Sequence, residues 1–231
     1  MTDETLEKII DSLNIPEAPD LIFLRPLTNK VFVGRVWLKL PSGGTFDENS
    51  YTMFFVRNQR KTVVAAVLDM GKQDLHIFVK PKHRGRGYLA DALRSVILPF
   101  LFASGRKEQQ ITFRTEQAKH HAQIVGFRLL TDAAAVITPD DLPAISAPTP
   151  KLVPSSDGQV KRIKQRIWEA AAFLRIARDD IQTAFGDDEA SKLNSVAASA
   201  EQHASHIHDL WHARKLSNNQ GRGRKKLLRH R

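Results

Sequence analysis

The spacing of apolar residues predicts a strand-rich region near the start of the chain. Between residues 21 and 79, β-branched and aromatic residues form short runs, which are separated by turn-forming segments such as "PSGG" and "RNQRK". Residues 3–13 instead carry leucine and isoleucine at helical spacing. We therefore expect a short amphipathic helix followed by a meander of antiparallel strands.

Beyond residue 88 the pattern alternates between helix and strand. The segments "GYLADALRSVILPFLFASG" and "EQAKHHAQIVG" have helical periodicity, and "QQITFRT" and "FRLLTD" have the composition of strands. This alternation after a meander is typical of an α+β fold. The sequence predicts a domain over residues 1–138 with a mixed central sheet and flanking helices.

The second half of the chain predicts a linker and a helical hairpin. Five prolines between residues 137 and 158 favour an extended linker, which we place at residues 139–158. Apolar residues then recur every three or four positions on both sides of Gly186, a residue typical of helix ends. We expect a helical hairpin over residues 159–216. Because two helices alone bury little apolar surface, the hairpin should pack on the first domain, on a partner protein or on a second copy in a homodimer.

The positive charge of the chain is concentrated at one end. Residues 217–231 hold six of the ten excess positive charges and no acidic residue, so they form a basic tail. This tail suits contact with the phosphates of a nucleic acid, and the alternative is a plain solvated tail. The chain has no cysteine, no apolar run approaching ~18 residues and no secretory-signal pattern. We expect a cytoplasmic protein that does not contact a membrane.

Four histidines cluster in the second half of the hairpin, namely His203, His206, His208 and His212. Positions 208 and 212 have the spacing with which a helix binds zinc, but no third ligand is clear from the sequence. We therefore expect histidines on a polar helix face and no metal site.

The stretch "VKPKHRGRGYLADAL" at residues 79–93 joins a strand-like run to a helix-like run through two glycines. A turn of this kind exposes successive backbone N–H groups at the positive end of a helix, which favours an anion. The P-loop pattern does not fit, because no Gly-Lys-Ser/Thr follows, and the dinucleotide fingerprint lacks its third glycine. The loop is a candidate anion site of another kind.

The loop resembles the signature of the GNAT acetyltransferase superfamily, which follows a strand ending in Val-x-Pro. Here Val79 and Pro81 precede Arg84-Gly85-Arg86-Gly87, although Leu89 stands where the family has a small residue. A second motif also matches: Ala118 lies eight residues before Gly126, which Phe127 follows. The resemblance covers roughly residues 20–135.

The resemblance implies binding of acetyl-CoA, or of another acyl-CoA, as co-substrate. The pyrophosphate would lie on the N–H groups of residues 84–89. The pantetheine arm would pair with the backbone of the strand "LHIFV", and a strand N–H would polarise the thioester carbonyl. The residues that the resemblance assigns to the cofactor are Phe78, Val79, Arg84, Gly85, Arg86, Gly87, Tyr88 and Leu89.

Transfer of an acyl group to an amine requires a base, because an alkylammonium with a pKa of ~10 is not a nucleophile at neutral pH. Many GNAT enzymes place a carboxylate near the start of the cofactor strand. Asp74 stands at about that point, with His76 two residues later on the same predicted face. The alternative interpretation is that Asp74 ends a turn and that His76 lies on the polar face of a sheet.

Three features depart from the family pattern. The usual acid is a tyrosine four residues before the glycine of Gly-Phe, and Ala122 stands there. Thr115 replaces a frequent asparagine, and residues 28–50 predict strand and turn where the family usually inserts helices that wall the acceptor groove. A thiol with a pKa of ~8.5 can leave without an acid, so activity is compatible with these departures.

Two functions of different classes follow. The first is an N-acyltransferase of GNAT type that moves an acetyl group from acetyl-CoA to an amine of a protein, a small molecule or an aminoacyl-tRNA. The alternative is a catalytically degenerate GNAT-fold module that acts through its hairpin and basic tail, on nucleic acid or within an assembly. An acyltransferase should bind acetyl-CoA and turn it over, whereas the degenerate module should bind it without turnover.

Overall fold

The computed structural model describes residues 1–15, 21–39, 50–144, 146–151 and 156–227, without the side chains of residues 208 and 214–227. The chain divides into two compact units, Met1–Val153 and Pro154–Arg231, which are described separately below. Within the described residues, no helix combines the length and the apolar character that crossing a membrane requires.

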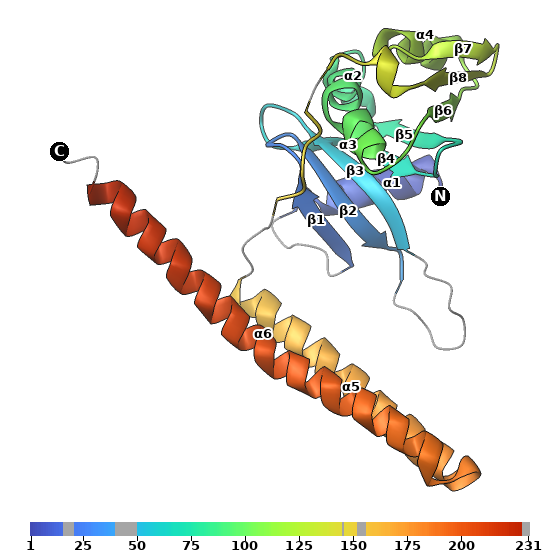
Figure 1. The fold of residues 1–231 in the computed structure, drawn as a ribbon. Helices are drawn as coiled ribbons and strands as arrows, with labels where there is room; N and C mark the ends of the chain where they lie inside the picture. The colour runs from blue at the N-terminus through green and yellow to red at the C-terminus, as the bar shows by residue number, and fades with distance from the viewer. Residues whose placement is uncertain (16–20, 40–49, 145, 152–155, 228–231) are drawn as a thin grey trace. The chain divides into compact units, whose positions relative to one another are not determined.

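The first unit contains a five-stranded sheet in which each strand pairs with its sequence neighbours, as the meander prediction requires (Figure 1). All four pairings are antiparallel. The strands are β1 (Ile22–Pro26), β2 (Val31–Trp37), β3 (Ser50–Arg57), β4 (Val63–Asp69) and β5 (Leu75–Val79). β5 therefore lies at an edge of this sheet.

Helices cover both faces of the sheet, which is why nearly every residue of β4 is buried. On one face, α1 (Asp3–Ser12) packs Leu6 and Ile10 against the sheet, and both side chains are fully buried. The other face is covered by a helical segment that comprises α2 (Tyr88–Ala92), a π-helical turn and α3 (Leu98–Ala103). Pro99 lacks the N–H group that an α-helical bond needs, and the wider turn lies just before it.

A second, three-stranded antiparallel sheet has the order β6-β8-β7. Its strands are β6 (Gln109–Thr112), β7 (Arg128–Thr131) and β8 (Ala134–Ile137), and α4 (Glu116–Val125) connects β6 to β7. The predicted α+β class is confirmed. Within the described residues every pairing is antiparallel, and β5 and β6, which would form the parallel pair of a mixed sheet, belong to different sheets.

The second unit is the predicted helical hairpin of α5 (Asp157–Phe185) and α6 (Asp187–Leu227). Ser156 accepts a hydrogen bond from the Gln159 backbone at the start of α5, and Gly186 ends the helix with a φ of 91°. Helix α6 continues through most of the residues that the sequence predicts as a basic tail. The stretch between Leu142 and Lys151, predicted as linker, contains no helix or strand in its described part.

Candidate functional site

The glycine loop leaves β5 through a single helical turn at Pro81–His83. Lys80 donates its backbone N–H to Val64 on β4, which is the last rung of the sheet. The N–H groups of His83 and Arg84 then turn back onto Lys80 and Pro81. The chain is thus fixed up to Arg84, and the loop begins there.

The two glycines adopt left-handed backbone conformations, with φ values of 70° at Gly85 and 78° at Gly87. A side chain at either position would meet open space, so the glycines serve the backbone conformation and not a tight fit. No acceptor among the described residues contacts the N–H groups from Gly85 to Leu89. These donors point into the space at the start of a helix that continues to Ala103.

Positive charge surrounds these donors. Lys82, Arg84 and Arg86 are exposed, and Arg84 Nε donates to the Val79 carbonyl at 3.1 Å, which holds its guanidinium beside the end of β5. Burial, and then the nearby Arg86, lowers the pKa of His83. His83 is therefore neutral at pH 7, and its Nδ1 atom is buried without a partner among the described residues.

The departure at Leu89 has a structural explanation. Its side chain is 5% exposed and belongs to the core beneath the helix, so it points away from the outer surface of the loop. Tyr88 is half-buried and packs against the same core. A large residue at position 89 therefore leaves the N–H groups of the loop accessible.

The edge of β5 exposes alternate backbone groups. Hydrogen bonds from Lys80 N to Val64 O and from Met70 N to Asp74 O fix which residues face β4. By the alternation of a strand, the backbone of Phe78 also faces β4, whereas Val79 and Ile77 face the open edge. Of the two strand residues predicted to bind the pantetheine arm, only Val79 can offer its N–H group there.

Hydrogen bonds join the turn before β5 to β6 along its length. Gln110 donates its backbone N–H to Lys72, and two positions later Thr112 N donates to Asp74 Oδ1 at 3.1 Å. The Thr112 hydroxyl donates to Asp74 Oδ2 at 2.8 Å. The fully buried Gln109 adds bonds to two carbonyls of the same turn. β6 thus lies beside the turn that precedes β5, runs in the same direction as that turn and ends at Thr112, next to Asp74. The edge of β5 towards Val79 has no hydrogen bond to β6 among the described residues.

The two predicted catalytic residues lie in different surroundings. Both carboxylate oxygens of Asp74 accept hydrogen bonds from Thr112, and Oδ1 also accepts from Leu75 N. His76 lies on the face of the sheet that α1 covers, with its Nε2 atom 2.8 Å from Asp3 Oδ1. The structure does not bring Asp74 and His76 to a common point.

Helix α4 contributes one half-buried polar group, His121. Ala122, at the position of the family's tyrosine, is 2% exposed and belongs to the core, while Thr115 caps the helix by accepting from Ala118 N. The neighbouring His121 is half-buried, and its Nε2 atom has no partner among the described residues. Burial, and then His120, lowers the pKa of His121, so its imidazole is neutral at pH 7.

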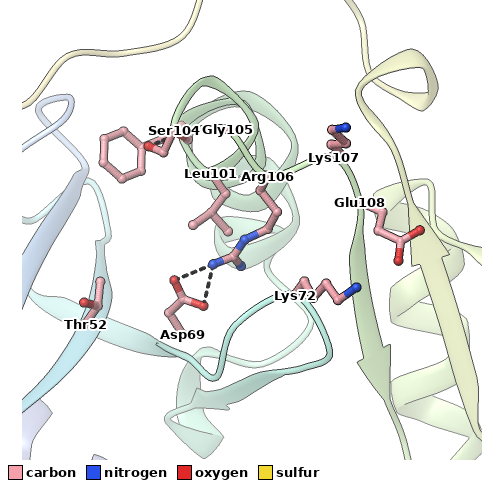
Figure 2. Close-up of a pocket in the computed structure, with 10 residues that line it drawn as sticks. Thr52, Asp69, Lys72, Leu101, Ser104, Gly105, Arg106, Lys107 and Glu108 are labelled. Carbon is pink, nitrogen blue, oxygen red and sulfur yellow. Dashed lines mark hydrogen bonds and ion pairs between the residues drawn. The ribbon is translucent and has the colours of Figure 1, made fainter.

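A separate cavity of about 710 Å³ lies at the far end of α3 (Figure 2). Arg106 points into it and donates two hydrogen bonds to the carboxylate of Asp69, at 3.0 and 2.9 Å. The helical segment from Tyr88 to Ala103 separates this cavity from the glycine loop by ~24 Å at 1.5 Å per residue. The cavity is therefore not part of the anion site.

The histidines of the hairpin do not form a metal site in the described part of the chain. His203 and His206 line a shallow hollow on α6 together with Asp209. Among the side chains that the structure describes, no three histidine, aspartate or glutamate groups converge on a point that could hold a metal ion.

No protein-family model matches the sequence, and no curated protein matches it. Among solved structures, a mutant of the spermidine N-acetyltransferase SpeG from Vibrio cholerae is similar over 60% of this chain and 92% of its own, with 14% identity and a TM-score of 0.35. A chimera of SpeG with hSSAT is similar over 40% of this chain and 69% of its own, with 14% identity and a TM-score of 0.32. At these scores the likeness is coarse, so functional proposals must rest on the residues of this chain.

Proposed function

We propose that residues 1–153 bind an acyl-coenzyme A and act as an N-acyltransferase of GNAT type. The observation that carries the proposal is the run of unpartnered N–H groups from Gly85 to Leu89, beside the open edge at Val79. Successive N–H donors at a helix start bind phosphate groups, and a free strand edge binds an extended amide chain. A pyrophosphate joined to a pantetheine arm combines both features in one molecule.

In this proposal the thioester lies along the open edge of β5. The Val79 N–H donates to the thioester carbonyl oxygen and stabilises the negative charge that develops there when a neutral amine attacks the carbonyl carbon. Collapse of the tetrahedral intermediate breaks the C–S bond, forms the amide and releases the thiolate. The proton of the attacking amine passes to water or to a nearby base.

Asp74 and His76 are the two groups that the sequence suggests for proton removal, directly or through water. Asp74 lies at the start of the gap between β5 and β6, but Thr112 occupies both of its oxygens. We propose that Asp74 acts mainly as a positioning residue, which holds the start of β5 against the end of β6. We propose an amine as the acceptor, whose ammonium form must lose a proton before it can attack the thioester at neutral pH.

A second candidate function is binding without turnover. Ala122 is buried in the core, so helix α4 offers no hydroxyl at the position of the family's tyrosine, and the only predicted carboxylate base is occupied. In this case the first unit holds coenzyme A as a ligand, and the hairpin with its basic end carries the function, on nucleic acid or within an assembly.

Calorimetric titration of the full chain with acetyl-CoA tests binding, and thiol release in the presence of a mixture of amines tests turnover. We expect a micromolar dissociation constant for acetyl-CoA and competition by coenzyme A. Binding with thiol release supports the transferase, and binding without it supports the second candidate. If neither acetyl-CoA nor coenzyme A binds at ~1 mM, the upper end of ordinary KM values, both are wrong.

A further inference from the structure

The hairpin has an interface of small residues between its two helices. Ala190, Ala197 and Ala204 recur every seven residues on α6, with exposed fractions of 3%, 0% and 0%. Ala171 on α5 is also fully buried. A seven-residue repeat is the pattern of helices that pack side by side in a bundle. The buried Val160 and the half-buried Leu174 and Leu193 extend this seam, and other apolar side chains on both helices remain exposed.

A second apolar stripe on α5 repeats with the same period. Ile163, Ala170 and Ala177 follow one another at seven residues, and Phe173 lies between them. Ile163 is 40% exposed and Phe173 is 71% exposed. Each residue of this stripe directly precedes a residue that faces α6, as Ala170 precedes Ala171. One residue corresponds to a rotation of about 100° around the helix axis, so the stripe lies about 100° from the seam on α5.

Helix α6 carries a matching stripe. Val196 and Leu210 directly precede seam positions, and they are 55% and 50% exposed. When two helices run antiparallel, the residue that precedes a seam position points to the same side of the pair on both helices. Both stripes therefore lie on one side of the hairpin, which we call the apolar face and define as Ile163, Ala170, Phe173, Ala177, Val196 and Leu210.

The opposite side of the hairpin carries a polar cluster around Arg175, and Trp168 and Ile176 are also exposed there, at 46% and 59%. Arg175 Nη2 donates to Glu201 Oε2 at 2.8 Å, and Arg175 Nη1 donates to Asn194 Oδ1 at 3.3 Å. These contacts place Arg175 level with about the midpoint of Asn194 and Glu201. Phe173 is thus near the level of Ala200, and Ile163 is near the level of Leu210. The apolar face therefore has one cluster at Ile163 and Leu210, while Phe173 lies near the middle of α5.

Charge is also distributed unevenly along the hairpin. Five acidic residues lie at the end where the helices join, namely Asp179, Asp180, Asp187, Asp188 and Glu189. Four basic residues lie on the first turns of α5, namely Lys161, Arg162, Lys164 and Arg166. A second hairpin running in the opposite direction would place each acidic end against a basic end.

The size of the apolar face is sufficient for a stable pair. At 1.5 Å per residue α5 is ~43 Å long, and two neighbouring helices present a width of ~20 Å. The resulting ~850 Å² per partner equals the area that a standard protein interface buries.

We propose that the apolar face binds the same face of a second copy of the chain, with the two hairpins antiparallel in a four-helix bundle. The two-fold axis lies near Ala170, so α5 packs on α5 of the partner. Phe173 of each copy then lies against the partner's α5 towards its Ile163 end. The proposal is independent of acyl-CoA binding by the first unit.

The absence of cysteine from the chain allows a direct test of the antiparallel geometry. A disulfide forms only between residues whose Cα atoms are within ~7 Å. Ala170→Cys lies at the proposed axis and should form a disulfide-linked dimer in high yield under mild oxidation. Ala184→Cys has the same seven-residue phase but lies at the acidic end, so it should remain largely unlinked. Equal linkage of both variants would contradict the antiparallel arrangement.

Sedimentation of the full chain tests the face itself. The wild type is expected to be a dimer at micromolar concentration, and Phe173→Glu should weaken the dimer by about 100-fold or more, because two buried rings are lost per dimer. Trp168→Glu is the matched control, since Trp168 is 46% exposed on the Arg175 side, and it should leave the dimer unchanged. Circular dichroism verifies that both variants remain helical. A monomeric wild type, or equal effects of the two variants, would overturn the proposal.

Discussion

The Thr112 hydroxyl donates a hydrogen bond to Asp74 Oδ2 at 2.8 Å and thereby joins the last residue of β6 to the residue that precedes β5. This contact connects the two sheets of the first unit. The edge of β5 that we propose as the thioester site is open because β6 ends beside Asp74, before it could pair with β5 up to Val79.

Asp74→Asn separates a positioning role from a catalytic base. The amide keeps one oxygen for the backbone N–H groups and loses one acceptor, so the free energy of unfolding should fall by about 1 kcal/mol. The dissociation constant of acetyl-CoA and any kcat should each change less than about threefold. A kcat reduced 100-fold with unchanged binding would instead identify Asp74 as the general base.

Gly87→Ala tests whether the loop binds phosphate, and Gly105→Ala is a control that places alanine in the same unfavourable left-handed backbone conformation. Gly105 also has a positive φ, of 98°, and also faces open space, but it lies at the far end of the helical segment. Each substitution should reduce stability by about 1 kcal/mol. Only Gly87→Ala should weaken acetyl-CoA binding, by about tenfold or more in calorimetry, because its methyl group occupies the approach to the N–H donors. Equal affinities would argue against phosphate binding at the loop.

Arg106→Ala should reduce the free energy of unfolding by about 3 kcal/mol, because it leaves a largely buried Asp69 without its partner. Lys107→Ala, one residue away and exposed, should change it by less than about 0.5 kcal/mol. Urea unfolding followed by circular dichroism measures both. Neither variant should affect acetyl-CoA binding, since the cavity lies at the other end of the helix from the loop.

His121 should make the stability of the protein depend on pH. Burial lowers its pKa in the folded chain, so the unfolded chain binds more protons than the folded chain as the pH falls below the ordinary histidine value of ~6.5. Stability is thus highest at neutral pH and decreases towards pH 5. The melting temperature should therefore fall between pH 7 and pH 5. His121→Gln should make this fall smaller, whereas His120→Gln, at the exposed neighbour, should leave it unchanged. If His121→Gln leaves the pH dependence of the melting temperature unchanged, this would contradict the burial of a neutral imidazole at position 121.

Periodicity was sufficient to predict the strand meander, the α+β class and the helical hairpin, because apolar spacing reports directly which face of an element is buried. Helical spacing likewise puts Leu89 on the inner face of its helix together with Leu93, and the structure buries both. Periodicity could not separate Phe78 from Val79, because the choice of backbone groups that face β4 depends on strand pairing. The bond between Asp74 and Thr112 joins residues far apart in the sequence, and no local pattern signals it.

Backbone amide hydrogen exchange, measured with and without coenzyme A, tests the central claim most directly. The N–H groups from Gly85 to Leu89 have no acceptor among the described residues, so they should exchange rapidly in the free protein. Saturating coenzyme A should slow exchange in residues 85–89 and at Val79, and should leave the cavity residues near Arg106 unchanged. Binding that protects the cavity segment, with residues 85–89 still exchanging rapidly, would contradict the account.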